Sequence, residues 1–110
     1  MVGGARARSK SVVAVLVGVD GILEGEVYPI RAGENRIGRL SGLEVTVPKS
    51  DDQISREHAV ILCQDGAFGI KPLKENNPTV VNGEVVVEGA PLSDGDEISL
   101  GRSTFRLKVV

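Results

Sequence analysis

Short runs of β-forming residues recur along this sequence, separated by turn-forming glycine, proline, asparagine and aspartate. Residues 104–110 alternate polar and apolar side chains, the period of two expected for a strand with one buried face. No window shows the apolar period of an amphipathic helix. About ten short strands at this spacing predict an all-β, two-sheet antiparallel β-sandwich, with a closed barrel as the alternative.

Turn signals set the predicted strand boundaries. Asp20-Gly21 should join a first strand, residues 12–19, to residues 26–31 in a hairpin. Asn82-Gly83 is the strongest short hairpin signal in the chain, and the polar segment 72–78 is predicted to be a loop. The other strands are predicted at residues 35–38, 43–47, 58–63, 67–71, 79–82, 85–87, 97–100 and 104–110.

The length of 110 residues suits one domain, which can bury about two-thirds of the surface of its unfolded chain. Residues 1–11 have no apolar pattern and are expected to form a flexible tail, and residues 12–110 the domain. Because the sequence stops inside a predicted strand, we expect this domain to be part of a larger protein.

Composition argues against several classes of function. The net charge is −2 and only 3% of residues are aromatic, so neither a basic surface for nucleic acid nor a base-stacking platform is expected. With one histidine and one cysteine in the chain, we expect no metal site, no cofactor and no internal disulfide. Cys63 lies in an apolar run, which predicts a buried structural thiol.

The start of the chain has one alternative interpretation. Basic residues before the apolar run 12–19 resemble the beginning of a secretory signal, but the run is β-branched and no cleavage site follows it. No stretch reaches the roughly 20 apolar residues of a membrane helix, so membrane insertion is not expected. Together with the unpaired cysteine, these features predict a cytoplasmic protein.

Hydrogen-bond donors stand where predicted strands end: Arg39 after one strand, Ser55 and Arg56 before another, and Asn76 and Asn77 in the predicted loop 72–78. An arginine can direct two N–H groups onto a dianion, a serine adds a hydroxyl, and an asparagine can both donate and accept. Such a set could bind a phosphorylated or carboxylated group on an extended peptide. The same residue types also decorate ordinary solvated loops.

Two neighbouring features have competing interpretations. Asp51, Asp52 and Glu57 could repel acidic peptides or form a solvated loop, and we favour the solvated loop. Ser55 and His58 invite comparison with a hydrolase. However, three residues apart on a strand they should point to opposite faces, and no carboxylate is placed to orient the histidine, so no enzyme is expected.

Four segments in order resemble the signature of the forkhead-associated (FHA) domain, a resemblance that covers roughly residues 12 to 110. The segments are Ile37-Gly38-Arg39, Ile54-Ser55-Arg56-Glu57-His58-Ala59, Asn77-Pro78-Thr79-x-x-Asn82-Gly83 and Leu92-x-Asp94-Gly95-Asp96-x-Ile98-x-Leu100-Gly101. The resemblance implies a β-sandwich of about eleven strands that binds a Thr-phosphorylated protein or peptide through loops at one end. The wording of the last two motifs resembles bacterial members.

The resemblance also implies a role in kinase-linked signalling or regulated assembly. The alternative is a phosphate-independent FHA scaffold for protein–protein assembly, for example in a larger bacterial protein or a secretion apparatus.

Carried over position by position, Arg39 matches the family's phosphate-contacting arginine. Ser55 matches the serine whose hydroxyl and backbone hold another phosphate oxygen, and Arg56 matches a variable position that often adds a contact. Asn77, with Asn76 beside it, matches the asparagine that binds the peptide backbone next to the phosphothreonine.

Other matched positions support the site in the family rather than touch the ligand. Gly38 and His58 are of this kind, and Asn82-Gly83 is mostly a turn. Pro78 departs from the pattern, because many members have glycine there. A proline fixes its own φ near −65° and favours extended geometry in the preceding residue, which should stiffen the loop around Asn77.

Overall fold

The computed structural model describes residues 11–110, so the predicted tail lies outside the described residues except for Ser11. The described chain forms eleven strands and no helix. They are β1 Val12–Asp20, β2 Val27–Arg31, β3 Gly33–Gly38, β4 Val45–Thr46, β5 Ala59–Gln64, β6 Ala67–Pro72, β7 Thr79–Val81, β8 Glu84–Val86, β9 Ala90–Leu92, β10 Glu97–Leu100 and β11 Ser103–Val109.

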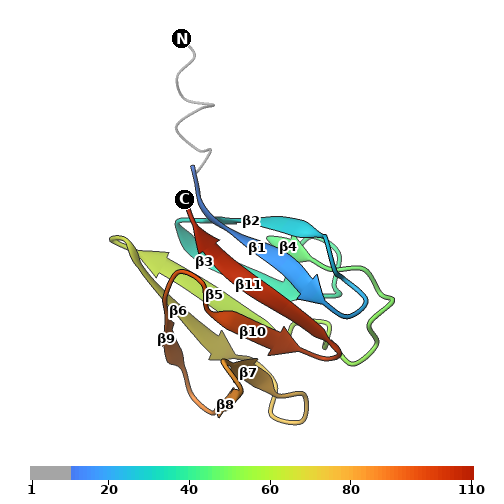
Figure 1. Ribbon diagram of the computed structural model, residues 1–110. Helices are drawn as coiled ribbons and strands as arrows, with labels where there is room; N and C mark the ends of the chain where they lie inside the picture. The colour runs from blue at the N-terminus through green and yellow to red at the C-terminus, as the bar shows by residue number, and fades with distance from the viewer. Residues whose placement is uncertain (1–10) are drawn as a thin grey trace.

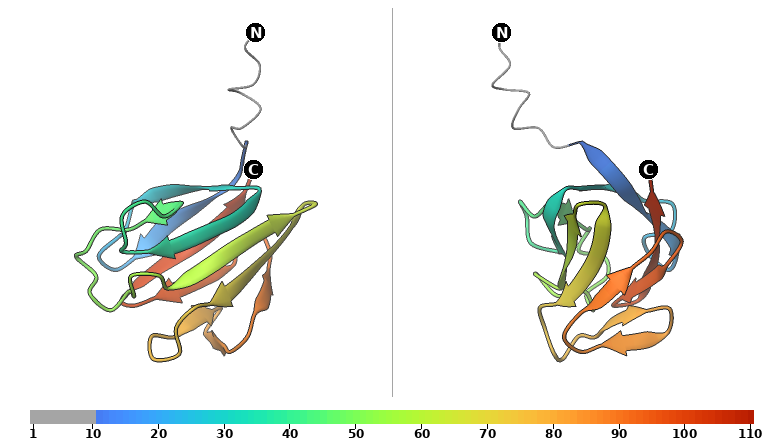
Figure 2. Two further views of the ribbon diagram at one scale, coloured as in Figure 1. Left: turned by 180° about the vertical axis from the view of Figure 1, so that it is seen from behind. Right: turned by 90° about the vertical axis from the view of Figure 1, so that its left-hand side faces the viewer.

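The strands make two sheets that pack face to face, which confirms the predicted sandwich (Figures 1 and 2). One sheet has the order β2-β1-β11-β10-β7-β8 and the other the order β4-β3-β5-β6-β9. Alternate residues of each strand point inward, so Leu16, Ile37, Ile61 and Phe105 are fully buried between the layers. Each such side chain contributes about 1.5–3 kcal/mol by burial. Cys63 is free and buried, as predicted.

The Asn82-Gly83 hairpin is confirmed and has a second role. Both residues have positive φ, 51° and 85°, as a type I′ turn requires. The Asn82 side chain accepts the Glu97 N–H at 2.9 Å and donates to Asp96 Oδ1 at 3.1 Å. The turn therefore holds the β7–β8 hairpin against the start of β10.

Two local predictions were wrong. β9 was not predicted, because Pro91 interrupts its short run; the structure accommodates this proline in an edge strand, where no neighbour needs its missing N–H. The segment 43–47 forms only the two-residue β4, which runs parallel to β3, so the sandwich is not wholly antiparallel. Val45 and Val47 are nevertheless buried, as the alternating pattern predicts.

Strand register gathers several loops at one end of the sandwich. Ile37 pairs with Ala59, which pairs with Pro72, so β3 ends where β5 begins and β6 ends. In the other sheet Thr79 pairs with Leu100, so β7 begins where β10 ends. The loops β3–β4, β4–β5 and β6–β7 therefore lie near the β10–β11 turn, away from Val110 (Figure 1).

Asp51 fixes the long β4–β5 loop to this end of the molecule. Its side chain is fully buried and accepts hydrogen bonds from Ser103 Oγ at 2.9 Å, the Arg102 N–H at 2.7 Å and the Gln53 N–H at 3.1 Å. The solvated interpretation of this segment is therefore wrong for Asp51. It fits Asp52, which is exposed, and Glu57, whose side chain is 42% exposed.

No helix among residues 11–110 has the length and apolar character needed to cross a membrane.

Replacing Asp51 with alanine should lower the free energy of unfolding by about 3 kcal/mol, because a buried hydroxyl and two backbone N–H groups lose their acceptor. At this chain length the melting temperature should fall by roughly 10–20 °C. Asp52→Ala is the matched control and should change it little, since the Asp52–Arg102 pair is exposed. Equal effects of the two variants would contradict the anchoring role of Asp51.

Candidate functional site

Arg39 continues the path of β3 beside the loop that leads into β5. Its N–H donates to the Ser55 carbonyl at 3.2 Å, and the next residue, Leu40, donates to the Arg56 carbonyl at 3.1 Å. The Arg39 side chain is held as well, because Nε donates to the Ile54 carbonyl. One edge of the guanidinium is thereby fixed. Among the described residues its two terminal nitrogens have no partner and remain able to donate.

Gly38 permits this close approach. Its φ is not in the left-handed region, so backbone freedom does not explain the residue. A Cβ at this position would lie 2.0 Å from the Arg56 carbonyl oxygen and 2.9 Å from the Glu57 Cα. Only glycine lets the end of β3 and the Arg56–Glu57 backbone touch, and this contact brings Arg39 beside Ser55.

Ser55 joins the β4–β5 loop to the β6–β7 loop. Its side chain is largely buried, and Oγ accepts a hydrogen bond from Asn77 Nδ2. This bond fixes the Asn77 amide while leaving its second N–H and its Oδ1 available. The Ser55 hydroxyl proton is likewise not used by this bond.

His58 provides the second link between the same loops. Its ring is fully buried; Nδ1 accepts the Ser55 N–H at 3.0 Å, and Nε2 lies 3.1 Å from the Pro78 carbonyl. Since Nδ1 is an acceptor, the neutral ring carries its proton on Nε2 and donates it to Pro78. Burial lowers the pKa of His58, against smaller opposite effects from the Pro78 and Asn77 backbone and from Asp51.

This geometry corrects two expectations. Ser55 and His58 do not face opposite sides of a strand, because β5 begins only at Ala59 and the Ser55 N–H turns back to the His58 ring. The family resemblance also implies a ligand contact by the Ser55 backbone. Here the Ser55 N–H is already bonded to His58, so the hydroxyl is the group of Ser55 left to donate to a ligand.

Two further sequence-predicted residues, Arg56 and Asn76, border the cluster along the chain. Arg56 and Asn76 are exposed, and within residues 11–110 neither side chain has a hydrogen-bond or ion-pair partner. They border Ser55 and Asn77 along the chain, but nothing fixes their side chains. Asn82 and Gly83 form the turn between β7 and β8. There Asn82 bonds Asp96 and Glu97 at the start of β10, so neither residue joins this cluster.

The acidic side chains of the β4–β5 loop are engaged elsewhere. Asp51 faces the β10–β11 turn, and Asp52 pairs with Arg102 at 2.9 Å. Glu57 pairs with Arg36 at 3.5 Å. The groups left available beside Ser55 are therefore cationic or neutral donors, a set suited to an anion with several oxygens.

Sequence reasoning missed the Ile54 carbonyl that holds Arg39, the Pro78 carbonyl that receives His58, and Asp51 behind the loop. The first two are backbone groups, which carry no residue signature. For Asp51 a signal existed in the sequence. An aspartate in a polar loop often accepts a hydrogen bond from the backbone N–H two residues later, as Asp51 does from Gln53.

The chain is similar in sequence to a known domain family and to a mycobacterial regulatory protein. The family model "FHA domain" matches residues 35–101, which include the whole cluster. The chain is 31% identical over 88 residues, 80% of its length, to the transcriptional regulatory protein EmbR of Mycobacterium tuberculosis, and spans only 22% of that protein.

Two solved structures agree with this match. One, from a structural and functional analysis of phosphothreonine-dependent FHA domain interactions, has a TM-score of 0.77 and 32% identity, and the similarity covers 89% of this chain and 97% of that one. M. tuberculosis EmbR in complex with a low-affinity phosphopeptide has a TM-score of 0.76 and 30% identity, with 90% of this chain and 25% of that one covered. Because the family model spans more than half of the residues and these folds coincide, this chain belongs to the FHA domain family.

Proposed function

We propose that this domain binds phosphothreonine in a partner protein or peptide through Arg39, Ser55 and Asn77. The observation that carries the proposal is the convergence of these three side chains from three different loops, each held by a hydrogen bond that leaves further donors available. The related structures just described include FHA domains with phosphothreonine-dependent interactions and a bound phosphopeptide, which supports the same ligand class.

Charge favours a phosphate over a carboxylate. A phosphothreonine carries about −1.5 to −2 charges and three terminal oxygens at neutral pH. The Arg39 terminal nitrogens would hold two of these oxygens, and the Ser55 hydroxyl would donate to the third. Arg56 would add long-range attraction, and Asn77 would hydrogen-bond the peptide backbone, with exposed Asn76 beside it. An aspartate or glutamate has two coplanar oxygens and one charge, so it would leave part of this set unused.

We place this binding in kinase-linked signalling or regulated assembly within a larger, cytoplasmic protein. In this account the domain acts as a binding module and performs no catalysis. We expect neither nucleic-acid binding nor insertion into a membrane.

Arg39→Ala should weaken phosphothreonine-peptide binding by about a hundredfold or more, since two charge-assisted hydrogen bonds are lost. The loss of the Ile54 contact should cost only about 1 kcal/mol of stability. Arg39→Lys should weaken binding to a similar extent, because one ammonium group cannot bond the Ile54 carbonyl and also donate two parallel hydrogen bonds to the phosphate. Fluorescence polarisation with a degenerate phosphothreonine peptide pool measures these changes.

Arg36→Ala is the matched control, because it removes the same charge three residues earlier in the chain, from β3. Arg36 is engaged with Glu34 and Glu57 rather than facing the cluster, so its loss should change affinity by no more than about twofold. An unphosphorylated pool that binds as tightly as the phosphorylated one would instead support the scaffold function. An effect of Arg36→Ala as large as that of Arg39→Ala would reduce the role of Arg39 to general electrostatics.

Mild acid should loosen the framework of the site. His58 accepts a proton near pH 6.5 when unfolded, at about its ordinary pKa, whereas the folded protein keeps the ring neutral to lower pH. As the pH approaches and passes below 6.5, the unfolded state binds more protons than the folded state. The free energy of unfolding should therefore fall as the pH drops from about 7.5 to 5.5. His58→Gln, which cannot titrate, should remove this slope in urea titrations; an unchanged slope would assign it to other groups.

A further inference from the structure

The outward face of β1 is apolar. Residues 12–19 contain no polar side chain, a composition typical of strands that are buried on both faces rather than on one. Alternate residues of the strand, such as Leu16, fill the core, whereas Val15 and Val17 point outward and are only partly buried. Figure 1 shows this sheet from outside, and no segment of the described chain crosses in front of β1. Within residues 11–110 this face therefore lacks the cover that its composition favours.

Strand register extends this apolar surface onto β2. Val15 pairs with Pro29 and Val17 pairs with Val27, so the four side chains lie on one face in two adjacent rows. Val27 is 57% exposed, and Pro29 is exposed as well. These four residues are called the β1–β2 patch below.

The β1–β2 patch is only two strands wide, because β11 on its other side is polar. Val15 pairs with Lys108, and Val17 pairs with Arg106, which is bound to Glu97 at 2.6 Å. Two strands with their side chains form a band about 10 Å across, and β1 is about 25 Å long. These dimensions match one α-helix of about 14–16 residues. A second sheet, by contrast, would place its further strands against the charged side chains of β11.

The two ends of the patch carry opposite charges. Asp20 ends β1 on one side, while Arg31 and Lys108 pair with Val12 and Val15 toward the other. Neither Asp20 nor Lys108 forms an ion pair with any residue of the range 11–110. A helix has a partial positive charge at its N-terminus and a partial negative charge at its C-terminus, whereas a strand has almost no net dipole. A helix antiparallel to β1 would therefore place each of its ends beside the opposite charge.

Residues 1–10 do not have the chemistry that this surface favours. They include three basic residues and no acidic residue, and Met1 and Val2 are their only large apolar residues. Such a segment offers neither the apolar stripe of an amphipathic helix nor a carboxylate for Lys108. The helix is therefore expected to come from a partner.

We propose that the β1–β2 patch of Val15, Val17, Val27 and Pro29 binds an amphipathic helix of a partner protein. The helix lies antiparallel along β1, with its apolar stripe on the patch and an acidic residue facing Lys108. Because the patch is on a sheet face and the proposed phosphothreonine site is formed by loops at one end, this second interaction requires no phosphate.

A designed peptide tests the chemistry of the partner. The probe is a side-chain-stapled helix of about 15 residues, with leucines at i, i+3, i+4 and i+7 and glutamates along one flank, titrated into the ¹⁵N-labelled domain. It should cause saturable amide shifts at Val15, Val17 and Val27, with a dissociation constant of roughly 0.1–1 mM for so small an interface. Lysines in place of the glutamates should weaken binding about threefold at low salt, and serines in place of the leucines should abolish the shifts.

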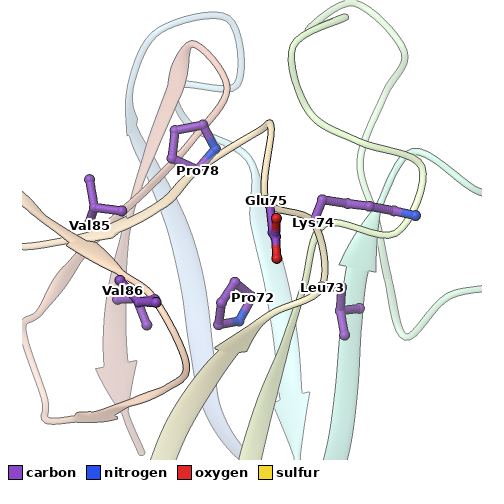
Figure 3. Close-up of a pocket in the computed structure, with 8 residues that line it drawn as sticks. Pro72, Leu73, Lys74, Glu75, Pro78, Val85 and Val86 are labelled. Carbon is purple, nitrogen blue, oxygen red and sulfur yellow. The ribbon is translucent and has the colours of Figure 1, made fainter.

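Variants of the domain test the surface. The double variant Val15→Thr, Val17→Thr keeps β-branched residues at both outward positions and should weaken binding of the leucine peptide about tenfold, while the rest of the amide spectrum stays that of the folded domain. Val85→Thr is the control, because Val85 is 62% exposed on β8, at the opposite edge of the same sheet, beside the pocket in Figure 3. It should leave helix binding unchanged. Lys108→Glu should remove or reverse the preference for glutamate over lysine.

The direction of the helix is tested with a nitroxide at the N-terminus of the peptide. It should broaden the amides near Asp20 more than those near Arg31, because the helix N-terminus faces Asp20. The opposite pattern overturns the proposal. So does a leucine peptide that leaves the patch amides unmoved, that binds equally well with lysine on its flank, or that binds the threonine double variant as tightly as the unaltered domain.

Dilution of the domain without peptide tests the other possible occupant. Concentration-dependent shifts of the same amides, together with a dimer in analytical ultracentrifugation, would identify a second copy of this chain as the occupant and overturn the proposal. None of these measurements depends on phosphothreonine binding, so the helix-binding proposal and the proposed function fail separately.

Discussion

The buried ring of His58 joins two loops that no strand pairing connects, and the candidate site depends on this link. Nδ1 accepts the Ser55 N–H while Nε2 donates to the Pro78 carbonyl, so one neutral tautomer satisfies a donor in one loop and an acceptor in the other. Either partner left alone in this buried place would cost about 1–3 kcal/mol. The ring therefore fixes the distance between Ser55 and the Asn77–Pro78 segment, which a ligand must span.

The rest of the fold supports this link from both sides. The register of β3, β5 and β6 brings three strand ends together, and Gly38 allows the backbones to touch where Arg39 leaves the sheet. Behind the loop, Asp51 binds the β10–β11 turn and so keeps a carboxylate turned away from the cluster. Asp51 thus stabilises the loop without adding a free carboxylate beside the donors.

Sequence predicted the sandwich because period-two alternation and turn residues report directly on strands and hairpins, as residues 104–110 and Asn82-Gly83 illustrate. It missed β9, where Pro91 masks the pattern, and the parallel pairing of β4, since register between distant strands leaves no local trace. At the site, residue types indicated the donors. Contacts made by backbone groups and the burial of Asp51 depend on tertiary packing, which composition and spacing do not record.

We propose that three loops at one end of the sandwich form a single phosphothreonine-binding surface. The most direct measurement is an NMR titration of the ¹⁵N-labelled domain with a phosphothreonine peptide, followed through backbone amide shifts. We expect saturable shifts at Gly38, Arg39, Ser55 and Asn77, with little change near Val110, and none of these shifts with the unphosphorylated peptide. Shifts that map to another face, or that appear equally without the phosphate, would contradict it.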